Sequence, residues 1–202
     1  MSELILASKS PRRRELLKLL GHPFSVLVSG IDEEMAVGET PAEHVTRLSE
    51  LKARDVGGRL GDAIVIGADT IVVLDGEILG KPSSPDEAVS MLMKLQGRTH
   101  RVYTGFALFD TESGKLLSDY EATDVTMGSM TKRSAKRYVE TGEPLDKAGS
   151  YGIQGYGAAL VTSIQGCYFT VMGLPLAKLM KALHAFSNGR FGYFGTSSEL
   201  TL

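Results

Sequence analysis

The residue whose chemistry stands out first is Asp69, a carboxylate between two apolar, β-branched runs. Ala63–Ile66 and Ile71–Leu74 both favour strands. Asp69 should therefore lie at or near a buried layer, where an unpaired charge is costly. Such a group needs a metal ion, a cation or a catalytic task. The alternative is a structural Asp that bonds backbone donors at a β-bulge marked by Gly67, and position alone leaves both interpretations open.

Further polar residues of unlike types lie at the ends or on the faces of predicted elements. They are Arg12, Arg13, Glu33, Lys52, Lys81 and Gln154. Carboxylates without histidine or thiol partners suit a hard cation such as Mg²⁺, and several lysines and arginines suit a polyphosphate. Together these residues indicate metal-assisted phosphoryl chemistry, in which positioning and charge neutralisation do most of the catalysis.

A predicted strand, loop and helix position the two arginines. Leu4–Ala7 reads as a buried strand, and Ser10 followed by Pro11 is typical of a helix N-cap and first position. Free N–H groups at this helix start, together with arginines, predict an anion site. At about 100° per residue, Arg13 projects over the apolar face and Arg12 lies at its edge. The alternative is a solvated basic turn.

For Glu33 and Lys52, a simpler interpretation without a role in a site is also open. Glu33 lies in the acidic loop Gly30–Glu34 after a predicted strand, and most acidic loops are simply solvated. Thr40–Glu43 is a capping box that opens a helix reaching about Val56. Lys52 interrupts the apolar face of that helix, so it either extends to the rim of the core or points inward to meet an anion.

Lys81 and Gln154 lie beyond the central apolar runs. Asp75–Gly76 is a two-residue turn typical of a hairpin, and Lys81 follows the returning strand. Gln154 lies in Glu143–Gly157, a glycine-rich stretch with neither helical nor strand periodicity. A long loop of this kind inside a compact domain is often functional.

The second half of the chain predicts mainly strands. Thr99–Asp110 and Leu116–Met127 suit a paired antiparallel ribbon. Ala158–Ile164 and Cys167–Met172 read as a hairpin, and a last helix follows them. Residues 187–202 are polar and glycine-rich, which predicts a weakly ordered tail.

Composition excludes several classes of protein. The 202 residues suffice for one domain or two small lobes, and 43% hydrophobic with 23% charged residues is typical of a soluble globular protein. A net charge of −2 argues against a nucleic-acid polymer as partner. Cys167 is the single cysteine, so no intrachain disulfide is possible. The sequence has no secretory signal and no apolar run of membrane-spanning length, so we expect a cytosolic protein without a membrane partner.

Familiar nucleotide-binding signatures and histidine metal-binding motifs are absent. Gly76–Pro82 resembles a P-loop but is one residue short and ends in proline where Ser or Thr must bind magnesium. Gly152-x-x-Gly155-x-Gly157 has the wrong order for a dinucleotide fingerprint and precedes no helix. The four histidines show no metal-ligand spacing.

Seven motifs in order resemble the Maf family of nucleoside-triphosphate pyrophosphatases. They are LILASKSPRR, GIDEE, LKA, GADTIVVLDGEILGKP, GRTHRVYTG, TGEPLDKAGSYGIQG and VMGLPL. The resemblance covers roughly residues 4–184. It implies an α/β fold similar to inosine-triphosphate pyrophosphatases, with an elongated, mixed, bent sheet flanked by helices and two lobes around a central cleft. We expect residues 1–186 to form one such domain.

The resemblance also implies roles for individual residues. Asp69 would accept the proton of the attacking water, and Glu33 with Asp69 would hold Mg²⁺ or Mn²⁺. The residues that would hold the triphosphate are Ser8, Arg13, Lys52 and Lys81. The residues that match the branch acting on dTTP and UTP are Arg12, Thr70 and Gln154. The branch acting on 7-methyl-GTP differs at those positions.

The sequence therefore predicts a cytoplasmic, metal-dependent dTTP/UTP pyrophosphatase. One alternative is a pyrophosphatase for another or modified nucleotide, such as 7-methyl-GTP. Another is a nucleotide-binding regulator of cell division, because the family is associated with septum inhibition. A homodimer follows from the resemblance alone.

Overall fold

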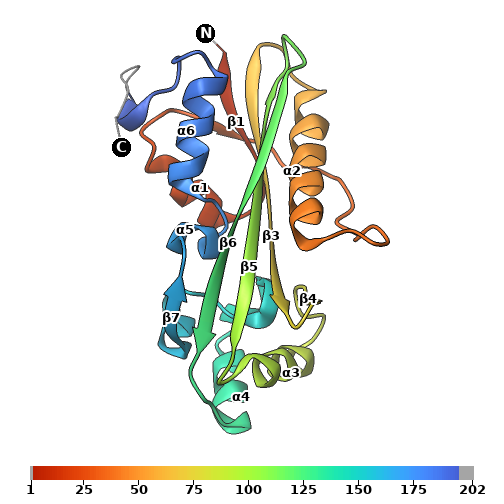
Figure 1. Cartoon of the computed structure of the whole chain (residues 1–202), viewed down its shortest axis with the longest axis vertical. Coiled ribbons are helices and arrows are strands. Elements are labelled where there is room, and N and C mark those ends of the chain that lie inside the picture. The colour runs from red at the N-terminus through yellow and green to blue at the C-terminus, as the bar shows by residue number, and fades with distance from the viewer. Residues whose placement is uncertain (1, 196–202) are drawn as a thin grey trace. The chain divides into compact units, whose positions relative to one another are not determined.

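The computed structural model describes residues 2–195, which contain one mixed sheet and helices flanking it (Figure 1). The strands are β1 (Glu3–Ala7), β2 (Ser25–Val26), β3 (Ala63–Leu74), β4 (Glu77–Leu79), β5 (Thr99–Asp110), β6 (Leu116–Met127) and β7 (Val161–Gln165). The α-helices are α1 (Pro11–Lys18), α2 (Pro41–Gly57), α3 (Pro85–Leu95), α4 (Lys132–Glu140), α5 (Tyr168–Met172) and α6 (Leu176–Phe186). Short 3-10 helices are η1 (Glu143–Asp146), η2 (Ala148–Ser150), η3 (Gly155–Leu160) and η4 (Tyr193–Gly195).

The sheet combines parallel and antiparallel pairs, which confirms the predicted mixed sheet. Its order is β2-β1-β3-β5-β6-β7, and β4 pairs with β3 outside this path. β1 is parallel to both β2 and β3, whereas β3–β4 and β6–β7 are antiparallel. Asp75 and Gly76 close the β3–β4 hairpin with φ values of 51° and 82°, which confirms the predicted two-residue turn.

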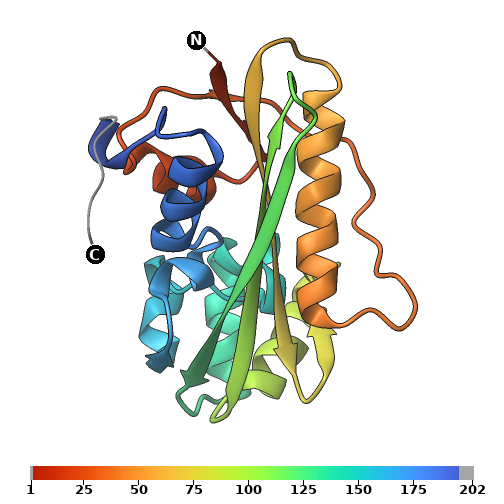
Figure 2. The same ribbon diagram turned by 45° about the horizontal axis from the view of Figure 1, so that its top comes forward.

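The chain forms two compact units. The first comprises Met1–Asp69, Thr104–Glu121 and Gly173–Leu202, and the second Thr70–Tyr103 and Ala122–Met172. The expected two lobes correspond to these units. In the first unit, α2 lies along one face of the strands, and α1 and α6 lie on the opposite side (Figures 1 and 2).

Helix caps in the first unit form as the sequence predicts. Thr40 accepts a hydrogen bond from the Glu43 backbone N–H, and the Glu43 side chain accepts one from the Thr40 N–H, which completes the capping box of α2. Ser10 caps α1 by accepting a hydrogen bond from the Arg13 N–H. Apolar side chains of β1, β3 and α2, such as Ile5, Val65 and Val56, form a buried cluster beneath α2.

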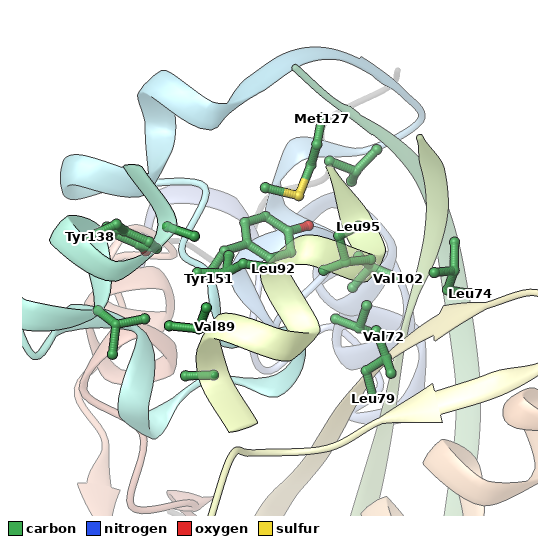
Figure 3. Packing of buried hydrophobic residues seen from close by; sticks show 14 residues of the cluster. Val72, Leu74, Leu79, Val89, Leu92, Leu95, Val102, Met127, Tyr138 and Tyr151 are labelled. Atoms are coloured by element: carbon green, nitrogen blue, oxygen red, sulfur yellow. The ribbon is translucent and has the colours of Figure 1, made fainter. Parts of the chain in front are cut away.

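The core of the second unit gathers around α3 and α4. Leu92 of α3, Tyr138 of α4 and Tyr151 belong to one buried cluster with side chains of β3, β5 and β6 (Figure 3). His100 is also buried in this unit, and its Nε2 atom lies 2.7 Å from the Tyr151 hydroxyl oxygen. The other ring nitrogen, Nδ1, has no hydrogen-bond partner among residues 2–195.

The buried His100 predicts a pH effect on stability. Burial lowers its pKa from 6.5 to about 4, and the charge of Asp124 opposes this only in part. Between these values the unfolded chain binds a proton that the folded chain does not, so unfolding becomes more favourable as the pH falls from 6.5 to 4. We expect His100→Gln to reduce the loss of unfolding free energy by up to about 1 kcal/mol per pH unit in this window. Urea denaturation at several pH values measures the free energy of unfolding of the wild type and of His100→Gln. If this free energy fell equally steeply with pH in both proteins, the prediction would be contradicted.

One expectation about local structure was wrong, and two others need refinement. Tyr168–Met172 forms the helix α5 instead of the second strand of a hairpin, although its aromatic and β-branched residues favour strands. The stretch Glu143–Gly157 contains 3-10 turns. The strand expected before the loop Gly30–Glu34 is limited to Ser25–Val26. The helix α5 buries Thr170 and Met172, so packing there outweighs a weak local preference.

Residues 187–195 continue from α6 and contact the residues that follow α1. The Gly195 N–H donates to the Leu20 carbonyl oxygen at 3.1 Å, and His22 Nε2 lies 2.5 Å from the Gly192 carbonyl oxygen. Residues 196–202 lie outside the described part of the chain, so the weak order of the whole tail stays a prediction. Every helix within residues 2–195 is too short or too polar to cross a lipid bilayer.

Candidate active site

Asp69 lies in the middle of β3 and has a charged partner. Only 7% of the residue is exposed, and its Oδ1 atom accepts a hydrogen bond from Lys52 Nζ at 2.6 Å. The cation compensates for the loss of hydration that burial imposes on the carboxylate. Gly67 is paired in regular parallel register with Ala7 of β1, so Asp69 lies in a continuous strand.

Lys52 reaches Asp69 because α2 packs unusually close to the sheet. A Cβ atom on Gly67 of β3 would overlap the carbonyl oxygen of Ser49, and one on Gly105 of β5 would overlap that of Val45. The two glycines therefore let the α2 backbone rest directly on the strands. Lys52 follows Ser49 on α2 and is 7% exposed, so it does not extend to the rim of the core.

Glu33 approaches the same lysine from the loop between β2 and α2. Its Oε1 atom lies 2.8 Å from Lys52 Nζ, and 46% of its side chain is exposed. Two carboxylates from distant parts of the chain thus converge on one cationic centre. Residues 2–195 contain no group of three or more His, Cys, Asp or Glu side chains arranged to hold a metal ion. Mg²⁺ commonly uses only one or two carboxylates and takes its other ligands from water and substrate phosphates, so this donor pair fits it.

Arg13 and Ser8 lie beside the strand that carries Asp69. Arg13 donates from Nε to the Gly173 carbonyl oxygen and from Nη1 to that of Ala68, each at 2.8 Å. Its Nη1 also lies 3.4 Å from the Ser8 hydroxyl oxygen. Burial lowers the pKa of Arg13 below its ordinary value, and the charges of Asp69 and Glu33 offset this only in part. The guanidinium is thus held, cationic, next to the backbone of β3.

The other predicted site residues differ in their exposure and in the unit to which they belong. Arg12 is half-buried in the first turn of α1. Thr70 follows Asp69 in β3 and is half-buried. In the second unit, Lys81 is exposed after β4, and Gln154 is exposed just before η3. The structure therefore brings Ser8, Arg13, Glu33, Lys52 and Asp69 together in the first unit.

Gly67 and Gly105 are the residues of the site that sequence reasoning missed. Gly67 was considered only as the mark of a bulge in the structural alternative for Asp69, whereas it allows α2 to approach β3. A signal was available, because glycine inside an apolar strand also marks a close approach of another backbone. The sequence alone could not name α2 as that backbone.

The family model of Maf-like protein matches residues 3–186. The chain belongs to the Maf family. A dTTP/UTP pyrophosphatase of Moorella thermoacetica is 52% identical over 186 residues, which cover 92% of this chain and 96% of that protein. Another, of Pelotomaculum thermopropionicum, is 50% identical over 92% of this chain and 97% of its own length.

Solved structures agree with the predicted fold of this Maf protein. The Staphylococcus aureus Ham1 protein has a TM-score of 0.52 and 15% sequence identity, over 93% of this chain and 99% of that one. This structural similarity confirms the expected fold type. At 15% sequence identity it supports a conclusion about the fold and none about activity.

Proposed function

We propose that this Maf protein hydrolyses dTTP and UTP to the nucleoside monophosphate and pyrophosphate. The observation that carries the proposal is the near full-length match, at about half identity, to relatives named dTTP/UTP pyrophosphatase. The cluster of Asp69, Lys52 and Glu33 supports the same chemistry, because it offers a base and opposite charges at one place.

Asp69 is the proposed general base. Its carboxylate accepts a proton from the water whose oxygen attacks the α-phosphorus, and the bond from that phosphorus to the bridging oxygen breaks as pyrophosphate leaves. Lys52 orients the carboxylate before substrate binds, through the contact of 2.6 Å. Once the nucleotide is bound, the same ammonium can neutralise phosphate charge.

The phosphates would be held by residues from several elements. Those proposed for this task are Ser8, Arg13, Lys52 and Lys81. Arg13 supports this role through its restrained guanidinium, which two backbone carbonyl oxygens orient. A group oriented before binding loses less conformational entropy on contact with the ligand.

Glu33 and Asp69 are the proposed ligands of a divalent cation, Mg²⁺ or Mn²⁺. Such an ion, when bound, supplies charge neutralisation at the phosphate oxygens. The convergence of both carboxylates on Lys52 supports the assignment, since the site already favours a cation there.

Base selection is assigned to Arg12, Thr70 and Gln154, which match the branch acting on dTTP and UTP. We propose that they contact the pyrimidine. Replacing Thr70 and Gln154 and measuring the order of preferred substrates tests this, and an unchanged order would overturn it.

Lys52→Met should weaken binding of a non-hydrolysable dTTP analogue about tenfold or more, because the buried ammonium is lost while the aliphatic stem is kept. Isothermal titration calorimetry measures the Kd. Lys18→Met is the matched control, because Lys18 is exposed and pairs with Glu15 on the surface of α1. Equal affinities for both variants would contradict the phosphate-binding role.

Pyrophosphate release from a panel of canonical and modified nucleotides, with Mg²⁺, with Mn²⁺ and without metal, tests the proposed function. We expect fast release from dTTP and UTP that is lost without metal. A preference for 7-methyl-GTP or another nucleotide would keep the reaction and change the substrate. Nucleotide binding with no release would support a regulator of cell division instead.

We further infer a cytoplasmic location, one catalytic domain over residues 1–186 and a homodimer. The location follows from the nucleotide substrate, and the homodimer from family resemblance. Light scattering of the purified protein tests the oligomeric state.

A further inference from the structure

The loop that carries Gln154 is tied to one carboxylate of the second unit. Glu143 accepts three hydrogen bonds, from the Tyr138 hydroxyl at 2.7 Å, the Tyr156 N–H at 2.8 Å and the Gly157 N–H at 2.9 Å. The Tyr138 hydroxyl in turn accepts a hydrogen bond from the Gly152 N–H at 3.1 Å. The backbone is therefore held on both sides of Gln154.

The glycines of this loop are what allow the backbone to close around Glu143. Gly155 has φ of +67°, and a Cβ atom there would overlap Glu143 Oε2. A Cβ atom on Gly157 would overlap the Gly152 carbonyl oxygen and lie 2.5 Å from the Tyr138 hydroxyl oxygen. The spacing Gly152-x-x-Gly155-x-Gly157, which matches no dinucleotide fingerprint, thus serves the wrapping of this carboxylate.

The three donors require an ionised acceptor. Glu143 Oε1 accepts from two of them and Oε2 from the third. Burial raises the pKa of Glu143, but the hydrogen bonds outweigh this and lower it overall. An amide has only one acceptor oxygen. In the Glu143→Gln variant the NH₂ group would therefore face a donor of the loop, whichever way the side chain turned.

We propose that Glu143 is a positioning residue for base selection, which holds the Gln154 loop in the conformation that reads the pyrimidine. The role rests on the proposed function, since it acts through Gln154. Gln154 itself is exposed, so its orientation depends on the backbone beneath it. Restraint of that backbone lowers the entropic cost of binding the correct base.

Glu143→Gln is the first test. We expect the ratio of kcat/KM for dTTP to that for dCTP to fall about tenfold, mainly through KM for dTTP, because the reacting groups stay in place. Glu140→Gln is the matched control, since this exposed residue of α4 undergoes the same change of charge three positions earlier. It should leave the ratio unchanged.

A double-mutant cycle separates positioning from general destabilisation. If Glu143 acts through Gln154, Glu143→Gln should change the ratio little in a Gln154→Ala background. Tyr138→Phe, which removes the link to Gly152, should lower the ratio in the same direction and serves if Glu143→Gln does not fold.

The outcomes distinguish this role from the function itself. A wild-type protein that hydrolyses no nucleotide would overturn the proposed function and this role with it. A wild-type protein that prefers dTTP to dCTP, with Glu143→Gln and Tyr138→Phe equal to the control, would overturn only the role of Glu143. Full additivity with Gln154→Ala would also overturn it.

Discussion

Replacing Asp69 with Asn should lower kcat for dTTP hydrolysis about a thousandfold, because an amide cannot accept the proton of the attacking water. The fold should persist. The Asn oxygen can still accept a hydrogen bond from Lys52, and Lys52 keeps its ion pair with Glu33 at 2.8 Å. Pyrophosphate release at saturating dTTP measures kcat, and thermal unfolding monitors the fold.

Asp62→Asn is a suitable control for this experiment. Asp62 is an exposed carboxylate directly before β3, so the charge change is the same without contact to the site. If Asp69 were only a metal ligand, a higher Mg²⁺ concentration should restore activity to Asp69→Asn. We expect no such recovery. Full activity of Asp69→Asn would remove Asp69 from the role of base.

Gly67→Ala should lower the free energy of unfolding by about 3 kcal/mol. The added methyl group would overlap the Ser49 carbonyl oxygen and lie 2.9 Å from the Ala53 backbone nitrogen. Both are backbone atoms of α2, which cannot rotate away, so the helix must move off the sheet. Lys52 would move with it, and activity should fall together with stability.

Gly61→Ala is the matched control, because a Cβ atom at Gly61 has no neighbour within 4 Å. Urea denaturation of both variants gives the free energies of unfolding, and dTTP hydrolysis gives the accompanying activity. Equal stability of the two variants would show that α2 tolerates the methyl group, and the packing explanation would then be wrong.

Much of the local structure was predictable because its causes lie within a few residues. The capping box Thr40–Glu43, the N-cap Ser10 and the turn Asp75–Gly76 formed as expected. Each depends on hydrogen bonds or dihedral angles that neighbouring residues determine. The helix α5 was missed because Tyr168–Met172 has no cap or periodicity that outweighs its preference for strands.

The sequence by itself determined the family and the types of side chain available for catalysis. It also indicated that Asp69 is not an ordinary core residue. Only the tertiary structure decided which groups meet. Lys52 contacts Asp69 and Glu33, which lie far from it along the chain, because two glycines let α2 rest on the sheet. Glu143 likewise gathers donors from both sides of Gln154. Such contacts depend on how distant segments pack, and hydrophobic periodicity carries no information about that choice.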